Sequence, residues 1–148
     1  MRLSQAIPAM PVSDIAAATR FYEERLAFTI AHQDEGFAVV VRDELELHLW
    51  LAGDQRWRTP VGNDLARSPV CSGAESFLAG TASCRVAVDD VDGLYAQMSQ
   101  SEVLHPIDRG SPVDTDHGTR EFATLDLDGN LLTFFRRLSS RTSQGANP

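Results

Sequence analysis

Glutamate, histidine and tryptophan alternate with leucine in one short run of this sequence, Leu45-Glu-Leu-His-Leu-Trp-Leu51. Side chains alternate between the two faces of a β-strand, so the four leucines share one face and Glu46, His48 and Trp50 share the other. The Glu46 carboxylate and the His48 imidazole could form half of a metal site, or His48 could hydrogen-bond to a neighbour or contact a ligand. A catalytic zinc site needs about three protein ligands, and this run supplies fewer.

Other arrangements of catalytic residues are missing from the sequence. The four histidines, His32, His48, His105 and His117, lie on separate segments without the His-x-x-x-His spacing of a metal-binding helix. The chain has no Gly-x-Ser-x-Gly nucleophile motif and no glycine-rich phosphate loop. Cys84 lies in an apolar strand, where we expect a buried, unreactive thiol. The sequence therefore predicts no catalytic residues, no bound metal and no cofactor.

The composition is that of one globular domain. The chain has 148 residues, 43% hydrophobic and 23% charged, and its two cysteines are too few for a disulfide framework. No apolar stretch reaches the roughly 18–20 residues that a membrane span requires, and the first residues lack the apolar run of a secretory signal. We therefore expect the protein in the cytoplasm.

The charge balance excludes several classes of partner. Acidic residues outnumber basic ones by 21 to 13, the net charge is −8, and every basic residue is an arginine. Such a surface repels phosphate backbones and anionic lipids, so we expect no nucleic-acid or membrane partner. The negative charge either attracts a cationic small molecule or only keeps the protein in solution.

A first set of elements surrounds the alternating run. Ser13 is a good N-cap for a helix over 15–26, where apolar residues recur at helical spacing. A short extended segment over 6–12 precedes this helix, and its two prolines suit the edge of a sheet. Three strands are predicted to follow, at 28–32, 37–42 and 45–52.

The same order of elements then returns. A strand over 83–88 precedes a helix that begins at Asp89-Asp90, a short segment lies near 104–107, and strands follow at 120–127 and 131–137. The residues between the last two strands, Asp128-Gly-Asn130, are typical of a tight turn. Repetition of a unit of this size is itself a fold signature. The sequence therefore predicts an α+β fold of two tandem βαβββ modules, about 4–52 and 81–138.

Two segments fall outside the repeat. Residues 53–80 form a polar loop longer than an ordinary connection, in which Trp57 either closes over a ligand or anchors the loop. Residues 139–148 are polar and predicted to form a disordered tail. A four-stranded sheet with one helix leaves its other face uncovered, so two such sheets must cover each other, within one chain or between two. We expect a single domain over 1–138, whose curved mixed sheet lines a cleft.

The two ends of the repeat resemble the vicinal oxygen chelate superfamily. The segments that carry the resemblance are 10–28, which begins Met-Pro-Val-Ser-Asp-Ile, and 118–135, which includes Asp-Leu-Asp-Gly-Asn. Within the superfamily, Gly36-Phe-Ala-Val-Val-Val-Arg-Asp43 and Arg120-Glu-Phe-Ala123 are most similar to the bleomycin resistance proteins. The likeness covers about residues 6–137. Ala27 departs from the family's usual glycine at the helix exit, where a left-handed alanine would cost on the order of 1 kcal/mol.

The resemblance implies two alternative functions. The superfamily's enzymes, such as glyoxalase I and the extradiol dioxygenases, hold a divalent metal at positions that fall here on Ile7, Glu46, Ser83 and Thr133. Of these only Glu46 could bind a metal as an anion, so a metal-dependent glyoxalase- or dioxygenase-type enzyme is the alternative rather than the preferred function. The preferred function is that of a bleomycin-resistance-like protein, or of a binder of another aromatic compound or antibiotic.

A bleomycin-resistance-like protein would sequester a flat, partly cationic antibiotic without turnover, in a homodimer whose two clefts are built from both chains. Alternation places Thr133 and Phe135 on the cleft face of the last strand, together with the glutamate, histidine and tryptophan described above. Phe37 and Arg85 join them by resemblance to groove-lining positions, although Arg85 stands where the family often has an aromatic residue. The candidate ligand-binding residues are Phe37, Glu46, His48, Trp50, Trp57, Arg85, Thr133 and Phe135.

Overall fold

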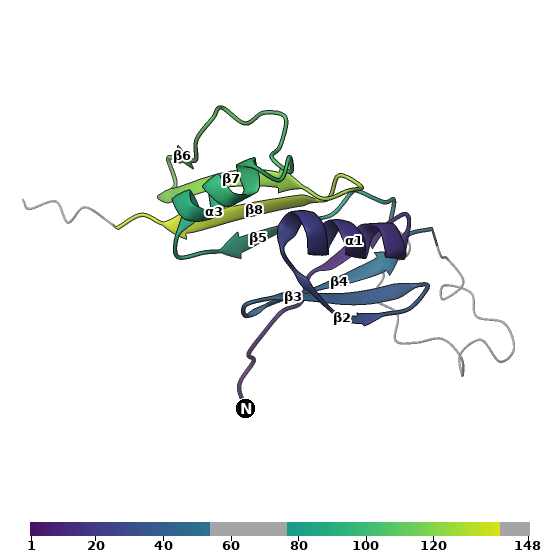
Figure 1. Cartoon of the computed structure of the whole chain (residues 1–148). Helices are drawn as coiled ribbons and strands as arrows, with labels where there is room; N and C mark the ends of the chain where they lie inside the picture. Colours follow the sequence, from purple (N-terminus) through teal and green to yellow (C-terminus); the bar gives the residue numbers. More distant parts are fainter. Residues whose placement is uncertain (54–76, 140–148) are drawn as a thin grey trace, which may run out of the picture.

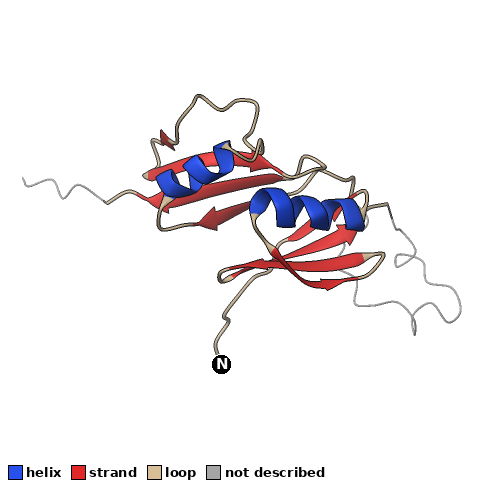
Figure 2. Ribbon diagram, viewed as in Figure 1, coloured by secondary structure: helices blue, strands red, loops and turns tan. Residues whose placement is uncertain are grey.

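Two modules of the same kind lie side by side in the computed structural model, which describes residues 1–53 and 77–139 (Figure 1). Each module is a four-stranded sheet with one helix packed across one face (Figure 2). The predicted α+β fold of two tandem modules is therefore confirmed. Trp57 and residues 140–148 of the predicted tail lie outside the described residues. No helix in the described part of the chain is long and apolar enough to cross a membrane.

The first module has its elements close to where the sequence predicts them. Its strand order is β1-β4-β3-β2, with β1 parallel to β4 and the other neighbours antiparallel. The proline-containing strand β1 lies at the edge, as expected for a residue that cannot donate to a ladder. The bounds are β1 (Ala9–Val12), α1 (Ile15–Leu26), β2 (Thr29–Gln33), β3 (Phe37–Arg42) and β4 (Leu45–Leu51).

The N-cap of α1 is Asp14, so the prediction of Ser13 at this position is wrong. Asp14 Oδ1 accepts a hydrogen bond from the Ala17 N–H at 2.7 Å. The Ser13 hydroxyl instead donates to Asp128 Oδ1 of the second module at 2.6 Å. Serine and aspartate are both good N-caps, so the capping preferences of these two adjacent residues do not decide between them. The tertiary contact of Ser13 favours Asp14 as the cap.

The exit of α1 is left-handed although alanine stands there instead of the glycine that the resemblance leads one to expect. Ala27 has φ 58° and ψ 36°, a conformation that glycine adopts without steric cost and alanine does not. The Phe28 N–H donates to the carbonyl of Tyr22 at 3.0 Å, which closes the end of the helix. The chain then turns directly into β2.

The second module repeats the first with one exception. Its strand order is β5-β8-β7-β6. The exception is the short segment expected near 104–107, where the structure has only an isolated bridge between Leu104 and Thr124 among the described residues. Strand β6 lies further on, in a stretch that the sequence predicts as loop, because two residues are too few to show an alternating pattern. The bounds are β5 (Ser83–Ala87), α3 (Val91–Ser99), β6 (Val113–Asp114), β7 (Thr119–Leu125) and β8 (Leu131–Arg137).

A buried polar cluster joins the two modules. The Tyr22 hydroxyl of α1 donates to Asp126 Oδ2 at 2.9 Å, and Asn130 Nδ2 donates both to that oxygen at 2.8 Å and to the Pro11 carbonyl at 2.9 Å. Burial raises the pKa of Asp126, although these hydrogen bonds oppose the shift, and it raises the pKa of Tyr22 well above its usual value. The cluster holds β1 and α1 against the β7–β8 turn.

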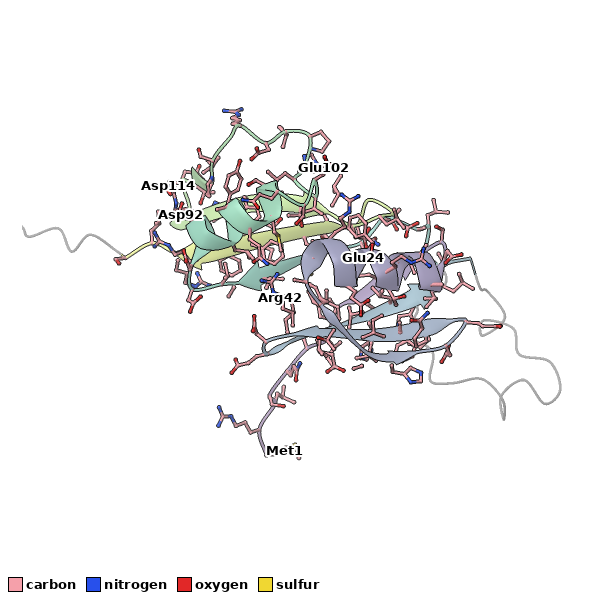
Figure 3. The ribbon with its side chains drawn as sticks, viewed as in Figure 1. Met1, Glu24, Arg42, Asp92, Glu102 and Asp114 are labelled. Atoms are coloured by element: carbon pink, nitrogen blue, oxygen red, sulfur yellow. The ribbon has the colours of Figure 1, made fainter. Side chains whose placement is uncertain are left out.

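An ion-pair network holds the short strand β6 in place. The Arg120 guanidinium lies 2.9 Å from Asp92 of α3 and 2.9 Å from Asp114 of β6, and the two aspartates lie at the same end of the module (Figure 3). These carboxylates raise the pKa of Arg120. Since Arg120 points to the helix side of its sheet, the network leaves the opposite face free.

Candidate functional site

The face of the first sheet that points away from α1 carries the residues of the alternating run. Leu47 and Leu49 of β4 are fully buried against the helix, whereas Glu46, His48 and Trp50 are partly exposed on the opposite face. This is the register that the alternation predicts. We call this surface the first open face.

Aromatic rings lie in contact across this first open face. Phe37 pairs with Trp50 in register, and their ring centroids are 4.6 Å apart. The His48 ring lies edge-on to Phe37 at 5.1 Å, and His32 lies on the other side at 5.7 Å. The sequence did not single out His32, because a register shift between Ile30 and His32 breaks the alternation of β2.

The carboxylate of Glu46 lies close to the imidazole of His48. His48 Nε2 is 3.2 Å from Glu46 Oε1, and both side chains are about one-third exposed or less. The face therefore offers flat rings for stacking and one carboxylate beside them. Such a surface suits an aromatic molecule with a positive charge.

The corresponding face of the second sheet carries the other predicted residues. Arg85 of β5, Thr133 of β8 and Phe135 of β8 share the side that points away from α3, and we call this surface the second open face. Arg85 Cζ lies 4.8 Å from the centroid of the Phe135 ring. Glu121 of β7 pairs with Phe135 in register and accepts a hydrogen bond from Arg85 Nη2 at 2.6 Å.

Glu121 is a candidate site residue that the sequence reasoning missed. The tight turn at 128–130 pairs Leu125 with Leu131, and counting back along both strands places Glu121 opposite Phe135. The signal was thus present, but its use required the register of the hairpin. The Arg85 guanidinium and the Thr119 hydroxyl, at 2.8 Å, lower the pKa of Glu121.

A pocket of about 360 Å³ borders the second open face. The segment between α3 and β6 forms one wall, where Ile107 is 69% exposed. Glu121 and Thr133 form part of the opposite wall. A small molecule in this pocket would therefore contact residues of the second open face.

The structure brings the predicted site residues together in two groups rather than one. Four lie on the first open face and three on the second, and among residues 1–53 and 77–139 no hydrogen bond or aromatic contact joins the two groups. The position of Trp57 lies outside the described residues. The modules contact each other elsewhere, for example where Arg42 Nη2 at the end of β3 donates to Gln97 of α3 at 2.9 Å.

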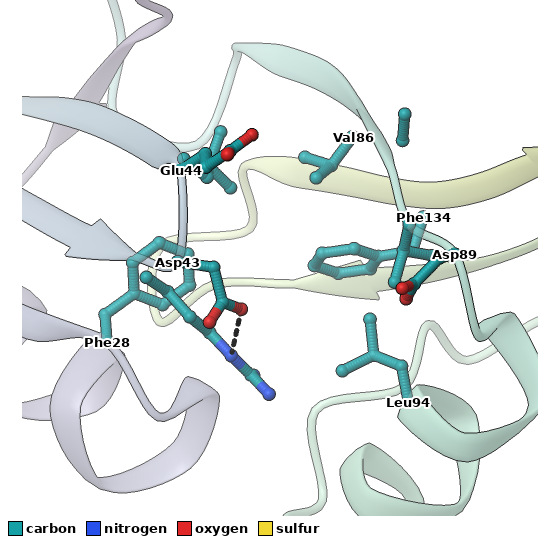
Figure 4. A pocket seen from close by; sticks show the side chains of 11 residues that line it. Phe28, Asp43, Glu44, Val86, Asp89, Leu94 and Phe134 are labelled. Atoms are coloured by element: carbon teal, nitrogen blue, oxygen red, sulfur yellow. Dashed lines mark ion pairs between the residues drawn. The ribbon is translucent and has the colours of Figure 1, made fainter.

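A further hollow, of about 430 Å³, lies between the modules on the side of their helices (Figure 4). Apolar side chains point into it and carboxylates stand at its rim. It contains none of the predicted site residues. Its labelled lining residues are Phe28, Asp43, Glu44, Val86, Asp89, Leu94 and Phe134.

The donor chemistry does not fit the metal site of the superfamily's enzymes. By the resemblance, Ile7 and the hydroxyls of Ser83 and Thr133 would stand where those enzymes have histidine, glutamate or glutamine, and the described residues leave Glu46 with His48 as its neighbouring donor. Within the described part of the chain, no three His, Cys, Asp or Glu side chains lie close enough to hold an ion. The absence of a bound metal stays a prediction, which elemental analysis of the purified protein would test.

The Cys84 thiol is half-buried on the helix side of its sheet. Burial and the Asp126 carboxylate raise its pKa to about 11. It is therefore protonated at neutral pH, which agrees with the expectation of an unreactive thiol.

Two tandem βαβββ modules with open sheet faces define a protein of the glyoxalase and bleomycin resistance fold. Solved structures of this class match most of the chain. A glyoxalase/bleomycin resistance protein/dioxygenase from Nocardioides matches with a TM-score of 0.65 and 21% identity over 95% of this chain and 87% of that one. A bleomycin-binding protein complexed with bleomycin matches with a TM-score of 0.63 and 25% identity over 91% and 99% of the two chains.

Sequence comparison narrows the class to one family. A family profile described as "Bleomycin resistance protein-like N-terminal" matches residues 8–42. Bleomycin resistance proteins from Geobacillus stearothermophilus and Staphylococcus aureus are 46% identical over 136 residues, which is 92% of this chain and 98% of each relative. The chain belongs to the bleomycin resistance protein family.

Proposed function

We propose that the protein binds bleomycin, or an antibiotic of similar flat and partly cationic shape, and sequesters it without turnover. The observation that carries the proposal is the 46% identity to bleomycin resistance proteins over nearly their whole length. The structural relative complexed with bleomycin supports the same ligand class. The protein would act in the cytoplasm, where it lowers the concentration of free drug.

The open faces supply the contacts that such a ligand needs. A flat heteroaromatic ring would stack on Phe37 and Trp50 of the first open face, whose centroids are 4.6 Å apart. A positive group would lie near the carboxylates of Glu46 and Glu121. Because each drug molecule is held rather than transformed, protection of the cell would need one binding site per molecule of drug.

The complete site is proposed to form between two chains. In one chain the two open faces carry half-exposed aromatic and charged side chains, and the two groups have no described contact with each other. A twofold axis would place the first open face of one protomer against the second open face of its partner, and it would do so twice. The homodimer would then hold two equal clefts, each built from both chains.

Isothermal titration calorimetry with metal-free bleomycin tests the proposal. We expect saturable binding with one drug molecule per chain, and mass spectrometry of the recovered drug should show it unchanged. Glu46→Gln should weaken binding, whereas Glu23→Gln, on the exposed side of α1, makes the same change of charge and should not. The absence of saturable binding, or chemical conversion of the drug, would contradict the proposal.

A further inference from the structure

The geometry points to Arg85 as an internal competitor of the ligand's positive charge. Its guanidinium lies over the ring of Phe135 and pairs with the carboxylate of Glu121. These are the two groups on the second open face that a cationic ligand would use. The ligand's cation replaces Arg85 on Glu121, so the exchange selects cationic ligands over neutral ones. This inference rests on the proposed function and deepens it by naming the residues that set specificity.

Three adjacent strands bring the groups of this exchange together. Arg85 comes from β5, Phe135 from β8 and Glu121 from β7, and Phe135 and Glu121 are directly paired in register. Arg85 Cζ lies 4.8 Å from the Phe135 centroid, while Nη2 and Nη1 lie 2.6 and 3.4 Å from the two carboxylate oxygens of Glu121. The guanidinium thus fills a position for a cation that is defined by one ring and one carboxylate.

The two charged partners differ in how firmly they are held. The Glu121 side chain is 19% exposed and also accepts a hydrogen bond from the Thr119 hydroxyl at 2.8 Å. The Arg85 side chain is 47% exposed, and its contacts among the described residues are with Glu121 and Phe135. A long, half-exposed side chain can move into water at little cost, whereas the anchored carboxylate stays. Arg85 is therefore the partner that leaves.

The selectivity for cationic ligands arises when a ligand displaces the Arg85 guanidinium from Glu121. Glu121 is only partly exposed, and a carboxylate with little access to water is unfavourable without a cation. A ligand that brings its own positive charge restores the pair, whereas a neutral aromatic ligand that displaces Arg85 leaves Glu121 with the Thr119 hydroxyl and the more distant His117 imidazole, 3.9 Å away. Arg137 does not take over this role, since its Cζ lies 6.0 Å from the Phe135 centroid and no described ion pair joins it to Glu121.

A ligand has access to this position. Glu121 and Thr133 also line the pocket of about 360 Å³ beside the second open face, so a molecule held there lies next to the carboxylate. The net charge of −8 further favours the approach of cations. Glu121 thus belongs both to an accessible pocket and to the ion pair with Arg85.

The test compares Arg85→Gln with the intact protein in calorimetric titrations. The two probes are metal-free bleomycin and a derivative of it whose positive end has been neutralised. We expect Arg85→Gln to bind bleomycin about three- to tenfold more tightly, because no internal cation has to be displaced. The neutralised derivative should gain by a similar factor, because it too no longer has to displace the guanidinium, and the ratio of the two affinities should fall only when the Glu121 carboxylate is removed. Arg20→Gln on α1 makes the same change of charge at an exposed position and should alter neither affinity.

A second variant assigns the effect to Glu121. Glu121→Gln should weaken the binding of bleomycin about tenfold, and Arg85→Gln should give no gain in the Glu121→Gln background, because the position then has no carboxylate to compete for. Thermal unfolding of each variant confirms that the protein is folded. If the intact protein binds bleomycin and Arg85→Gln binds it equally or more weakly, the inference is wrong and the proposed function stands. If neither binds bleomycin, the proposed function fails.

Discussion

Trp50 and Leu49 are neighbours in β4 with opposite surroundings. Trp50 is partly exposed beside Phe37 on the first open face, whereas Leu49 is fully buried under α1. Stacking on an aromatic side chain contributes roughly 1–3 kcal/mol where it has been measured for nucleic-acid bases, and a flat drug should gain a similar amount. The two residues should therefore respond differently to truncation.

We expect Trp50→Ala to weaken the binding of bleomycin about ten- to a hundredfold, since about 1.4 kcal/mol corresponds to a factor of ten. Leu49→Ala should instead lower the free energy of unfolding by about 2–5 kcal/mol. Denaturation midpoints and ligand titrations on both variants measure the two effects. The reverse result, with unfolding by Trp50→Ala and altered binding by Leu49→Ala, would overturn the assignment of the site to this face.

The carboxylate of Glu121 makes stability depend on pH. Arg85 and Thr119 favour its charged form and hold its pKa below the usual value of 4.5. A carboxylate whose pKa is lower in the folded than in the unfolded chain stabilises the fold above its ordinary pKa. That contribution is lost as the pH falls through the folded value.

Chemical denaturation at neutral and at acidic pH tests this linkage. The free energy of unfolding of the intact protein should exceed that of Glu121→Gln at pH 7 by about 1 kcal/mol or less, because the pair is partly exposed. The difference should shrink as the pH falls through the lowered folded pKa of Glu121, since the carboxylate is then protonated in both states. A difference that stays constant between the two pH values would show that the ion pair with Arg85 is not its source.

The exit of α1 is the element boundary where the sequence departs from its family pattern. Ala27 takes the left-handed conformation with φ 58°, and its side chain is exposed, so the strain is not offset by packing. Ala27→Gly should raise the free energy of unfolding by up to about 1 kcal/mol. The measurement is the shift of the denaturant midpoint.

A matched variant gives the opposite sign. Ala96 is exposed within α3, in a right-handed helical conformation, so Ala96→Gly should lower the free energy of unfolding by about 0.5–1 kcal/mol. Destabilisation by both substitutions would mean that the strain at Ala27 is smaller than the entropy that glycine adds to the unfolded chain.

At the scale of the whole molecule, the uncovered sheet faces lead us to expect a homodimer. Light scattering at micromolar concentration should give twice the chain mass of 16.2 kDa. Because the proposed cleft takes one face from each protomer, titrations should find the same number of sites as chains. A monomer mass at that concentration, with full binding of bleomycin, would show that one chain suffices for the site.

Much of the fold was already predictable from the sequence, since it depends on local patterns. The alternation over 45–51 determined the register of β4, the spacing of apolar residues determined α1, and Asp128-Gly-Asn130 determined the last hairpin. Each pattern is complete within a few residues. The period of the apolar residues shows whether a strand or a helix can bury them on one face. The departure at Ala27, in contrast, was visible only through the resemblance to a family that usually has glycine at this position.

Only the tertiary structure decided how these elements meet. It assigned the helix cap to Asp14 because Ser13 contacts the other module, and it showed that the predicted site residues of the two modules have no described contact with each other. It also brought Glu121 to Arg85, which lies 36 positions away in the chain. Such contacts depend on how segments that are distant in the chain pack against each other. The local pattern of residue types within one element does not contain this information.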